Sequence, residues 1–316
     1  MNILITGGAG FIGSHLSDAL LSEGHSVIAF DNLLRGKLEN ITVAQQHPNF
    51  KFIKGDILNK NELFDIFSKH NINTVFHMAA NSDIASSHAN PDVDFENTLK
   101  TTYNVLLAMK AFGVKNILFA STSAIYGDTK VKVSETYGPL LPISHYGASK
   151  LASEGYISSF CENYGIKAWI TRFPNVVGER ATHGVIYDFI NKLKTNPYEL
   201  EVLGDGSQIK PYLYVKDLVE AMLLIWCNTN EQINYFNLGV ESRTSVKEIA
   251  EMVIEEMGLD AKIKYTGGNK GWVGDVPQFS YSLEKIHSLG WKAKFSSNEA
   301  VRKSIKYILE KDLCKQ

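Results

Sequence analysis

Short apolar runs alternate with helix-length segments through the first half of the chain. The runs cover residues 2–6, 27–30, 50–53, 74–77, 116–120 and 167–172. Between them, residues 11–24, 59–70, 92–112 and 146–164 have the pattern of helices. Because strands that alternate with helices pair in parallel and carry helices on both faces, this rhythm predicts an α/β fold with a doubly wound parallel sheet.

The pattern changes after Asn175. Glycines, prolines and turn residues become more frequent, and the expected strands and helices become shorter. We therefore predict a first domain at residues 1–174 and a smaller, mixed α/β domain at residues 175–316. One strand of the second part, at about residues 234–239, is expected to return to the main sheet.

The first apolar run leads directly into a glycine-rich turn. Gly7, Gly10 and Gly13 are spaced G-x-x-G-x-x-G, and a helix begins at Phe11 and Ile12. Glycines here allow a sharp turn, a close approach to a pyrophosphate and tight packing of helix on sheet, while the helix N-terminus offers N–H groups to an anion. Together these features predict the cofactor loop of a dinucleotide-binding (Rossmann) domain; an ordinary glycine-rich turn is the alternative.

Asp31 ends the second apolar run, 18 residues after Gly13. A carboxylate at this place can bind both hydroxyls of an adenosine ribose and repels a 2′-phosphate, so it favours NAD over NADP. Arg35 and Lys37 argue the other way, because either cation can pair with that phosphate, but they lie in the following loop. The structural alternative is an aspartate that caps a turn.

Tyr146 and Lys150 are four residues apart on an expected helix, so they share one face. A phenol with a pKa of about 10 must lose roughly three units to act as a base near neutrality, which is worth about 4 kcal/mol. One ammonium and a cationic nicotinamide ring together can supply that. We therefore predict Tyr146 as the base and Lys150 as its charged neighbour, which also binds the nicotinamide ribose.

Hydroxyl side chains follow the fifth apolar run, at Thr122 and Ser123. A hydroxyl there can hydrogen-bond to a substrate alcohol and to the Tyr146 oxygen, which orients the alcohol for removal of its proton. The alternative is that these residues only close a loop. The presence of these hydroxyls, the Tyr-x-x-x-Lys pair and the glycine loop in one chain favours a catalytic site over a chance combination of motifs.

Composition narrows the class of protein without naming it. The chain has 316 residues, 34 acidic and 32 basic side chains and a net charge of −2, so neither disorder nor a nucleic-acid surface is indicated. Its three cysteines are scattered, which suits a reducing compartment, and no apolar run reaches membrane-spanning length. We expect a cytoplasmic protein without a membrane segment. The nine histidines show no ligand spacing, so no metal is predicted, and His77 and His145 are expected to be structural.

Motifs along nearly the whole chain resemble the extended short-chain dehydrogenase/reductase family, and within it the nucleotide-sugar epimerases. They are the glycine loop, Asp31-Asn32, Gly55-Asp56-Ile57, His77-Met78-Ala79-Ala80, Thr122 to Gly127, Tyr146-x-x-x-Lys150, Arg172 to Asn175, Gly204 to Gln208, Tyr214 to Asp217 and Leu289 to Trp291. The resemblance implies that Asp56 and Ile57 hold the adenine of NAD and that Ala79 and Ala80 lie beside the cofactor. It also implies that Asn175 binds the sugar nucleotide and that Thr122 is the catalytic hydroxyl.

The chain departs from the family pattern at three places. Thr98 occupies the position of an asparagine, with Asn97 one place early. Lys210 replaces an arginine that binds the diphosphate, and a lysine cannot form the planar fork of an arginine. In residues 271–277, Trp272 replaces the arginine of the R-x-G-D-x-P motif and Asp275 keeps its aspartate. Lys210, Trp272 and Asp275 are therefore expected in substrate binding; a loop lysine and a packing tryptophan are the alternatives.

The activity implied by the resemblance is NAD-dependent 4-epimerisation of a nucleotide diphosphate hexose, with a UDP-sugar as first choice, through a 4-keto intermediate. A dehydratase, decarboxylase or 4-reductase of the same substrates is the next alternative, and a non-catalytic NAD-binding protein is the third. Dehydratases of the family carry Asp-Glu after the catalytic threonine, where this chain has Ser123 and Ala124.

The resemblance also implies a homodimer, in which the helices at residues 92–112 and 146–164 of two copies form a four-helix bundle. Their apolar side chains are Leu99, Tyr103, Leu106 and Leu107 on one helix and Leu151, Ile157 and Phe160 on the other.

Overall fold

The computed structural model describes residues 1–81, 84–268, 271, 276 and 278–313. The chain divides into two compact units. Unit 1 comprises Met1–Ile125, Pro139–Arg172 and Met222–Phe236, and unit 2 comprises Tyr126–Gly138, Phe173–Ala221 and Asn237–Gln316. Assigning these units to cofactor and substrate binding, with one boundary between residues 174 and 175, stays a prediction.

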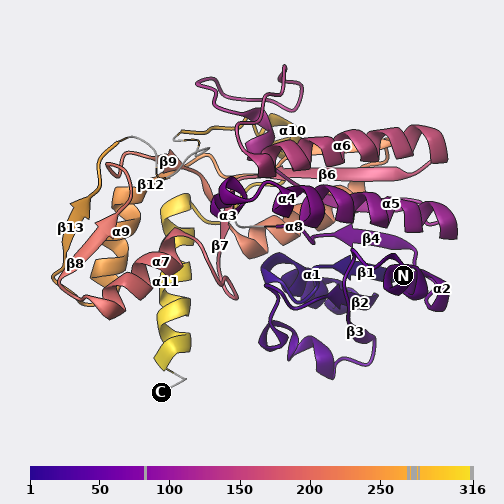
Figure 1. Cartoon of the computed structure of the whole chain (residues 1–316), viewed down its shortest axis with the longest axis horizontal. Helices are drawn as coiled ribbons and strands as arrows, with labels where there is room; N and C mark the ends of the chain where they lie inside the picture. Colours follow the sequence, from indigo (N-terminus) through magenta and orange to yellow (C-terminus); the bar gives the residue numbers. More distant parts are fainter. Residues whose placement is uncertain (82–83, 269–270, 272–275, 277, 314–316) are drawn as a thin grey trace. The chain divides into compact units, whose positions relative to one another are not determined.

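Unit 1 is built on a seven-stranded parallel sheet with the strand order β11-β6-β5-β4-β1-β2-β3 (Figure 1). Its strands are β1 (Asn2–Thr6), β2 (Ser26–Asp31), β3 (Phe50–Lys54), β4 (Thr74–His77), β5 (Asn116–Thr122), β6 (Lys167–Phe173) and β11 (Ile233–Asn237). In the middle of the sheet, Thr6 pairs with Phe30 of β2 and His77 of β4. The predicted doubly wound α/β fold is confirmed.

Helices cover both faces of this sheet. They are α1 (Phe11–Ser22), α2 (Lys60–Lys69), α3 (Ile84–Ala89), α4 (Asp92–Asp94), η3 (Phe95–Lys100), α5 (Thr101–Phe112), α6 (His145–Tyr164) and the end of α8 (Val215–Asn228), with short 3₁₀ turns η1 (Leu38–Ile41), η2 (Ala44–Gln46) and η4 (Ser123–Tyr126). One core cluster joins α2, α5 and α6 to alternate sheet residues such as Val75. On the other face, Phe76 packs edge-on against Trp226 of α8.

Capping residues set the ends of the helices that position the site. The Asn59 side chain accepts from the backbone N–H of Asn61 at the start of α2, and Ser144 accepts from Gly147 at the start of α6. A left-handed Gly165 ends α6. These caps fix where each helix starts or stops relative to the sheet.

The helix predicted at residues 92–112 is not uniform. It consists of α4, the π-helical segment η3 and α5. A π-turn adds a residue to the helical turn and shifts the register of everything that follows it. Apolar periodicity does not reveal such a shift, so the prediction of one regular helix was wrong in this respect.

Unit 2 has a separate core and small sheets. Its elements are β7 (Asn175–Val177), α7 (Val185–Thr195), β8 (Glu199–Val202), β9 (Ile209–Lys210), β10 (Tyr212–Tyr214), β12 (Thr244–Ser245), α9 (Val246–Glu256), β13 (Lys262–Tyr265), α10 (Glu284–His287) and α11 (Ser297–Leu313), with the start of α8. The pairs β7–β10 and β8–β13 are parallel, whereas β9–β12 is antiparallel. The core lies between α7, α9, α11 and strands β7, β8 and β10.

Within the described residues, no helix combines the length and the apolar character needed to span a membrane. The cytoplasmic location inferred from the scattered cysteines stays a prediction that cell fractionation would check.

Candidate active site

The residues predicted to bind the cofactor lie at the carboxyl ends of neighbouring strands in unit 1. Gly7, Gly10, Phe11, Ile12 and Gly13 follow β1; Asp31 ends β2 and Asn32 follows it; Asp56 and Ile57 follow β3; Ala79 and Ala80 follow β4. Thr122 ends β5 and Ser123 comes next. Because the strands are parallel, these ends share one edge of the sheet.

The glycine loop is packed so tightly that side chains are excluded from it. Gly7 has a left-handed backbone (φ 68°), and a Cβ there would lie 2.9 Å from the Ala79 nitrogen. A Cβ on Gly13 would lie 2.2 Å from the Gly7 carbonyl oxygen. The first turn of α1 therefore lies directly against the end of β1, with its free N–H groups next to the loop.

Asp31 is held against this loop. Its carboxylate accepts from the backbone N–H of Ala9 at 3.1 Å and of Leu33 at 2.8 Å. Burial raises the pKa of Asp31, and hydrogen bonds from Leu33, Ala9 and Gly10 partly offset that effect. The side chain is thus fixed where β2 ends beside the glycine loop, the position that a ribose-binding carboxylate requires.

The far end of the row is built around Asp56. Its carboxylate accepts from the Asn32 side chain at 3.2 Å and from the Leu58 N–H at 2.8 Å. The Ile57 side chain is buried, and its carbonyl accepts from Asn104 of α5 at 3.0 Å. These bonds join the ends of β2 and β3 where the adenine is expected.

Thr122, Tyr146 and Lys150 come together at the other end of the row. The Thr122 hydroxyl is hydrogen-bonded to the Tyr146 side chain. The Lys150 ammonium lies 5.9 Å from the centre of the Tyr146 ring and donates to the Ala120 carbonyl at 2.6 Å. Ser123, the other predicted hydroxyl, is half-buried at the start of η4.

Gly147 allows Thr122, Tyr146 and Lys150 to come together. The sequence analysis did not identify this role. A Cβ there would lie 2.6 Å from the Ala124 carbonyl oxygen and 3.0 Å from the Pro142 side chain. Any other residue would push the start of α6 away from the turn after β5. A glycine directly after the candidate base was the available signal.

Burial shifts the ionisation of Tyr146 and Lys150. Burial raises the pKa of Tyr146 to about 12, although the hydrogen bond from Thr122 lowers it. Burial also lowers the pKa of Lys150 to about 7, against the opposite effect of nearby Asp94 and Glu154. In the chain alone, burial has the largest effect on the phenol. The predicted acidification combines the ammonium with a cationic nicotinamide ring, so it stays a prediction for the cofactor-bound protein.

His77 is fixed as a neutral side chain. Its ring nitrogens bond to the hydroxyls of Thr6 at 2.6 Å and Thr102 at 3.0 Å, and the Thr102 hydroxyl donates onward to the Thr98 carbonyl. Burial, followed by the Lys150 charge, lowers the pKa of His77 to about 3. A buried neutral ring with both nitrogens bonded is structural, as predicted.

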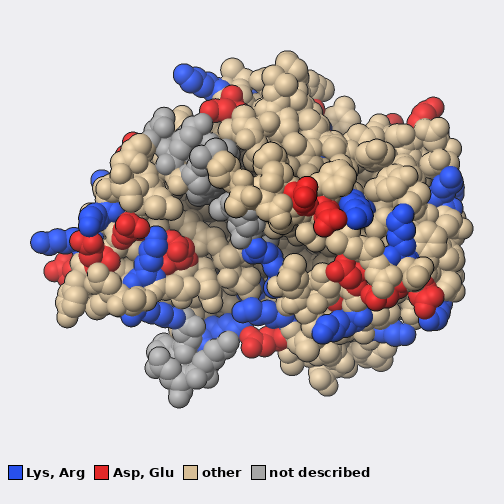
Figure 2. Space-filling view, viewed as in Figure 1, with Lys and Arg blue, Asp and Glu red and all other residues tan. Residues whose placement is uncertain are grey.

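Buried charge gathers around α6. Most charged side chains of a protein lie at its surface, and Figure 2 shows basic and acidic side chains spread over the visible face. Asp94, Lys150, Glu154 and Arg172 are instead buried in unit 1. Glu154 accepts two hydrogen bonds from Arg172, at 3.1 and 2.6 Å, and one from Ser121 at 2.5 Å. This network ties β5, β6 and α6 together one residue before Thr122.

The predicted substrate residues belong to unit 2. Asn175 is exposed at the start of β7 and pairs with Tyr212 of β10, two residues after Lys210. Lys210 is half-buried in β9. Trp272 and Asp275 lie outside the described residues. Asn175 thus lies in the β7–β10 pair and Lys210 in the β9–β12 pair.

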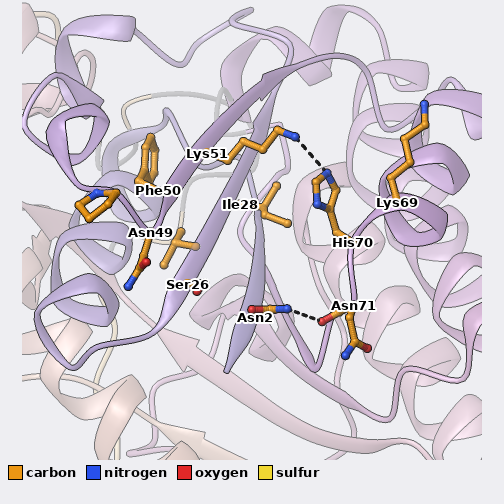
Figure 3. A pocket seen from close by; sticks show the side chains of 11 residues that line it. Asn2, Ser26, Ile28, Asn49, Phe50, Lys51, Lys69, His70 and Asn71 are labelled. Atoms are coloured by element: carbon orange, nitrogen blue, oxygen red, sulfur yellow. Dashed lines mark hydrogen bonds between the residues drawn. The ribbon is translucent and has the colours of Figure 1, made fainter.

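A pocket elsewhere in unit 1 has a different character. It is lined by Asn2, Ser26 and Phe50 at the amino ends of β1, β2 and β3, together with Lys51 and His70 (Figure 3). The Lys51 ammonium is 3.4 Å from the His70 ring nitrogen. Since this is the opposite edge of the sheet from Thr122, it is not the candidate active site.

The row of strand ends fits an extended dinucleotide. From β5 to β3 there are four inter-strand steps of about 4.8 Å, or about 19 Å in all. The glycine loop is central, with Asp31 and Asp56 on one side of it and Lys150 on the other. The residues present therefore suit a cofactor with a nucleoside at each end and a pyrophosphate in the middle.

Comparison with known proteins agrees with this geometry. Residues 3–239 match the model of the NAD dependent epimerase/dehydratase family. The chain belongs to that family. A family member from Halalkalibacterium halodurans named UDP-glucose 4-epimerase is 33% identical, with 95% of this chain and 93% of the relative covered.

Solved structures of family members share the whole fold. UDP-glucose 4-epimerase from Thermotoga maritima, solved with UDP-glucose, is 35% identical, with a TM-score of 0.88 over 98% of this chain and 99% of that one. UDP-glucose 4-epimerase from Thermus thermophilus, solved with NAD, is 30% identical with a TM-score of 0.87 over the same shares.

Proposed function

We propose that this protein is an NAD-dependent 4-epimerase of a UDP-hexose. The observation that carries the proposal is the contact between the Thr122 hydroxyl and Tyr146, with Lys150 one helical turn away, at the end of the strand row that fits NAD. The names of the relatives, UDP-glucose 4-epimerase, support the choice of reaction and of substrate.

In this proposal Thr122 and Tyr146 share the 4-hydroxyl of the hexose. Tyr146, as phenolate, takes the hydroxyl proton, and Thr122 keeps the oxygen in line by a hydrogen bond. The Lys150 ammonium stabilises the phenolate. NAD, when bound, supplies the reversible hydride chemistry at C4. Return of the proton from Tyr146 to the opposite epimer closes the cycle, so no second substrate is consumed.

The residues after Thr122 favour epimerisation over dehydration. Loss of water from the neighbouring carbons requires an acid and a base besides Tyr146. Ser123 and Ala124 supply neither, and Ala124 is bound through its backbone N–H to the Thr122 oxygen at 3.2 Å. Neither Ser123 nor Ala124 could therefore carry the 4-keto intermediate on to loss of water.

We expect the purified protein to retain NAD rather than NADP, because Asp31 stands at the ribose position. It should interconvert 4-epimers of a UDP-hexose without added NADH, and deuterium placed at C4 should stay there. Mass spectrometry of products from UDP-, GDP-, CDP- and dTDP-sugars measures both the base preference and the label. Stoichiometric build-up of NADH, or loss of the label to solvent, would assign the protein to the dehydrogenase or dehydratase alternatives.

Asn175, Lys210, Trp272 and Asp275 remain our candidates for binding the nucleotide diphosphate. Asn175 is supported by its exposed position at the start of β7, and Lys210 lies two residues before Tyr212, the β10 residue that pairs with Asn175. Measuring KM for the preferred sugar in a Lys210→Met variant tests the most direct of these contacts, and an unchanged KM would exclude it.

We also propose a homodimer formed through α5 and α6. Leu106, Ile157 and Phe160 belong to the core of unit 1, so they cannot form its surface. Tyr103 and Tyr156 are 37% and 45% exposed, and their rings meet edge-to-face at 5.3 Å. An exposed aromatic pair across two neighbouring helices is typical of an interface.

Light scattering at micromolar concentration should give twice the mass of the chain, and charges at the patch (Tyr103→Glu with Tyr156→Glu) should give the single mass. Tyr198→Glu, at a residue of unit 2 that is 79% exposed, is the matched control. A wild-type protein of single mass would refute the dimer.

A further inference from the structure

Asp94 is a buried carboxylate that the reaction described above does not use. The residue, in α4, has no exposed surface. Its Oδ1 atom accepts from the Asn81 side chain at 2.9 Å, whereas its Oδ2 atom is buried without a hydrogen-bond partner among the described residues. A buried charge is costly unless an opposite charge lies nearby. The carboxylate therefore requires a counter-charge close to it.

The position of Asp94 is fixed by the end of β4. Asn81 donates its side-chain N–H to Asp94 and its backbone N–H to Thr98, at 2.9 and 3.2 Å. Four residues further on, Thr102 receives the His77 ring N–H. Asp94 precedes the π-helical segment η3 and Thr98 lies within it. The register of η3 lets both side chains hydrogen-bond to Asn81. Asp94 is thus held rigidly beside the strand end.

The surroundings of Lys150 identify its counter-charge. Within the described part of β5, the ammonium donates to the Ala120 carbonyl and lies 4.7 Å from the centre of the Phe119 ring. From β4, His77 faces it as a neutral ring. On α6, the Glu154 carboxylate is already paired with Arg172. Among the residues that the structure describes, this leaves Asp94, on the α4 segment packed against α6, as the carboxylate near Lys150 that has no other ion-pair partner. Its charge raises the pKa of Lys150 more than that of Glu154 does, and it also raises the pKa of Tyr146.

We propose that Asp94 is a positioning residue of the active site: it is the buried counter-charge that keeps Lys150 in the ammonium form on which the Tyr146 base depends. The effect of this role on turnover rests on the proposed epimerase function. The charge pairing between Asp94 and Lys150 does not depend on it. Asn81 and η3 are then the parts of the fold that hold the carboxylate in place.

The test on turnover is the pH profile of kcat in Asp94→Asn. An asparagine has nearly the same shape and keeps an oxygen to accept from Asn81, while a neutral NH2 group replaces the second, charged oxygen. The pKa values of Lys150 and Tyr146 then both fall, so the profile shifts toward lower pH, by about 0.5 to 2 units for one charge at an effective dielectric of about 20. Asp92→Asn, two residues earlier and exposed, is the control and should leave the profile in place. A lower kcat with an unshifted profile would mean a purely structural role and would overturn the proposal.

A second readout needs no substrate. In wild type, Asp94 stabilises the folded state while Lys150 is charged, that is, below its pKa of about 7. The loss of melting temperature in Asp94→Asn should therefore be larger at pH 6 than at pH 9, and this excess loss at pH 6 should be absent in the Lys150→Met background. A loss that is equal at both pH values would refute the pairing. Since unfolding does not depend on turnover, this measurement tests the pairing of Asp94 with Lys150 even in a protein without epimerase activity. Such a lack of activity would contradict only the proposed function.

If Asp94→Asn does not fold, Lys150→Met alone provides the test. Without its cation the charged Asp94 carboxylate would be buried unpaired, which destabilises the folded protein. The stability of Lys150→Met, compared with wild type, should then decrease as the pH rises from about 4 to 7. A constant difference over that range would overturn the proposal.

Discussion

We expect Tyr146→Phe to lose at least about a hundredfold in kcat while it still binds NAD and substrate. The substitution removes the phenol oxygen that is hydrogen-bonded to Thr122 and keeps the ring that lies 5.9 Å from the Lys150 ammonium. Packing therefore changes little. Proton removal from the sugar hydroxyl loses its base, which no other group within the described residues replaces at that position.

The measurement is kcat and KM for the preferred UDP-hexose, with NAD content determined on the same preparation. Tyr156→Phe, on the exposed face of the same helix, is the matched control and should behave as wild type. A near-normal kcat in Tyr146→Phe would remove the residue from the mechanism. A low kcat with lost NAD would instead show that the tyrosine acts through cofactor binding.

Local pattern was enough to predict the row of strand ends. A short apolar run followed by Gly7, by Asp31 or by Thr122 predicts a strand and the residue at its carboxyl end, and parallel pairing brings those ends together. The strand order then follows from topology. For this reason, the predicted cofactor and catalytic residues of unit 1 could be assigned to one edge of the sheet without any information about long-range contacts.

The supporting contacts escaped prediction because each joins residues that are distant in the sequence. Ser121, Glu154 and Arg172 meet from β5, α6 and β6, and Asp94 meets Asn81 only through the π-turn of η3. Periodicity reports which face of an element is apolar and says nothing about which buried charges are paired across elements. The raised pKa of Tyr146 in the chain alone was not predicted either, because two residues four apart reveal a neighbour but not the effect of burial.

Among substitutions in the buried network of Ser121, Glu154 and Arg172, we expect Arg172→Met to reduce stability most. Both charged side chains of the Glu154–Arg172 pair are 8% exposed, and their closest atoms are 2.6 Å apart. Removal of the arginine leaves a buried carboxylate whose remaining hydrogen-bond partner among the described residues is the Ser121 hydroxyl, a situation that costs about 3–5 kcal/mol in the free energy of unfolding. Because Ser121 precedes Thr122 and Glu154 follows Lys150 by one turn, the loss should also loosen the catalytic pair.

The free energy of unfolding from urea titration measures the effect. Arg302→Met is the control, because Arg302 pairs with Glu255 and Glu256 at the surface and such a pair contributes about 1 kcal/mol or less. The double variant Glu154→Leu with Arg172→Met removes both charges and should recover most of the lost stability, since it leaves no unpaired carboxylate. If Arg172→Met costs no more than Arg302→Met, or if the double variant recovers nothing, the buried ion pair is not what joins α6 to β5 and β6.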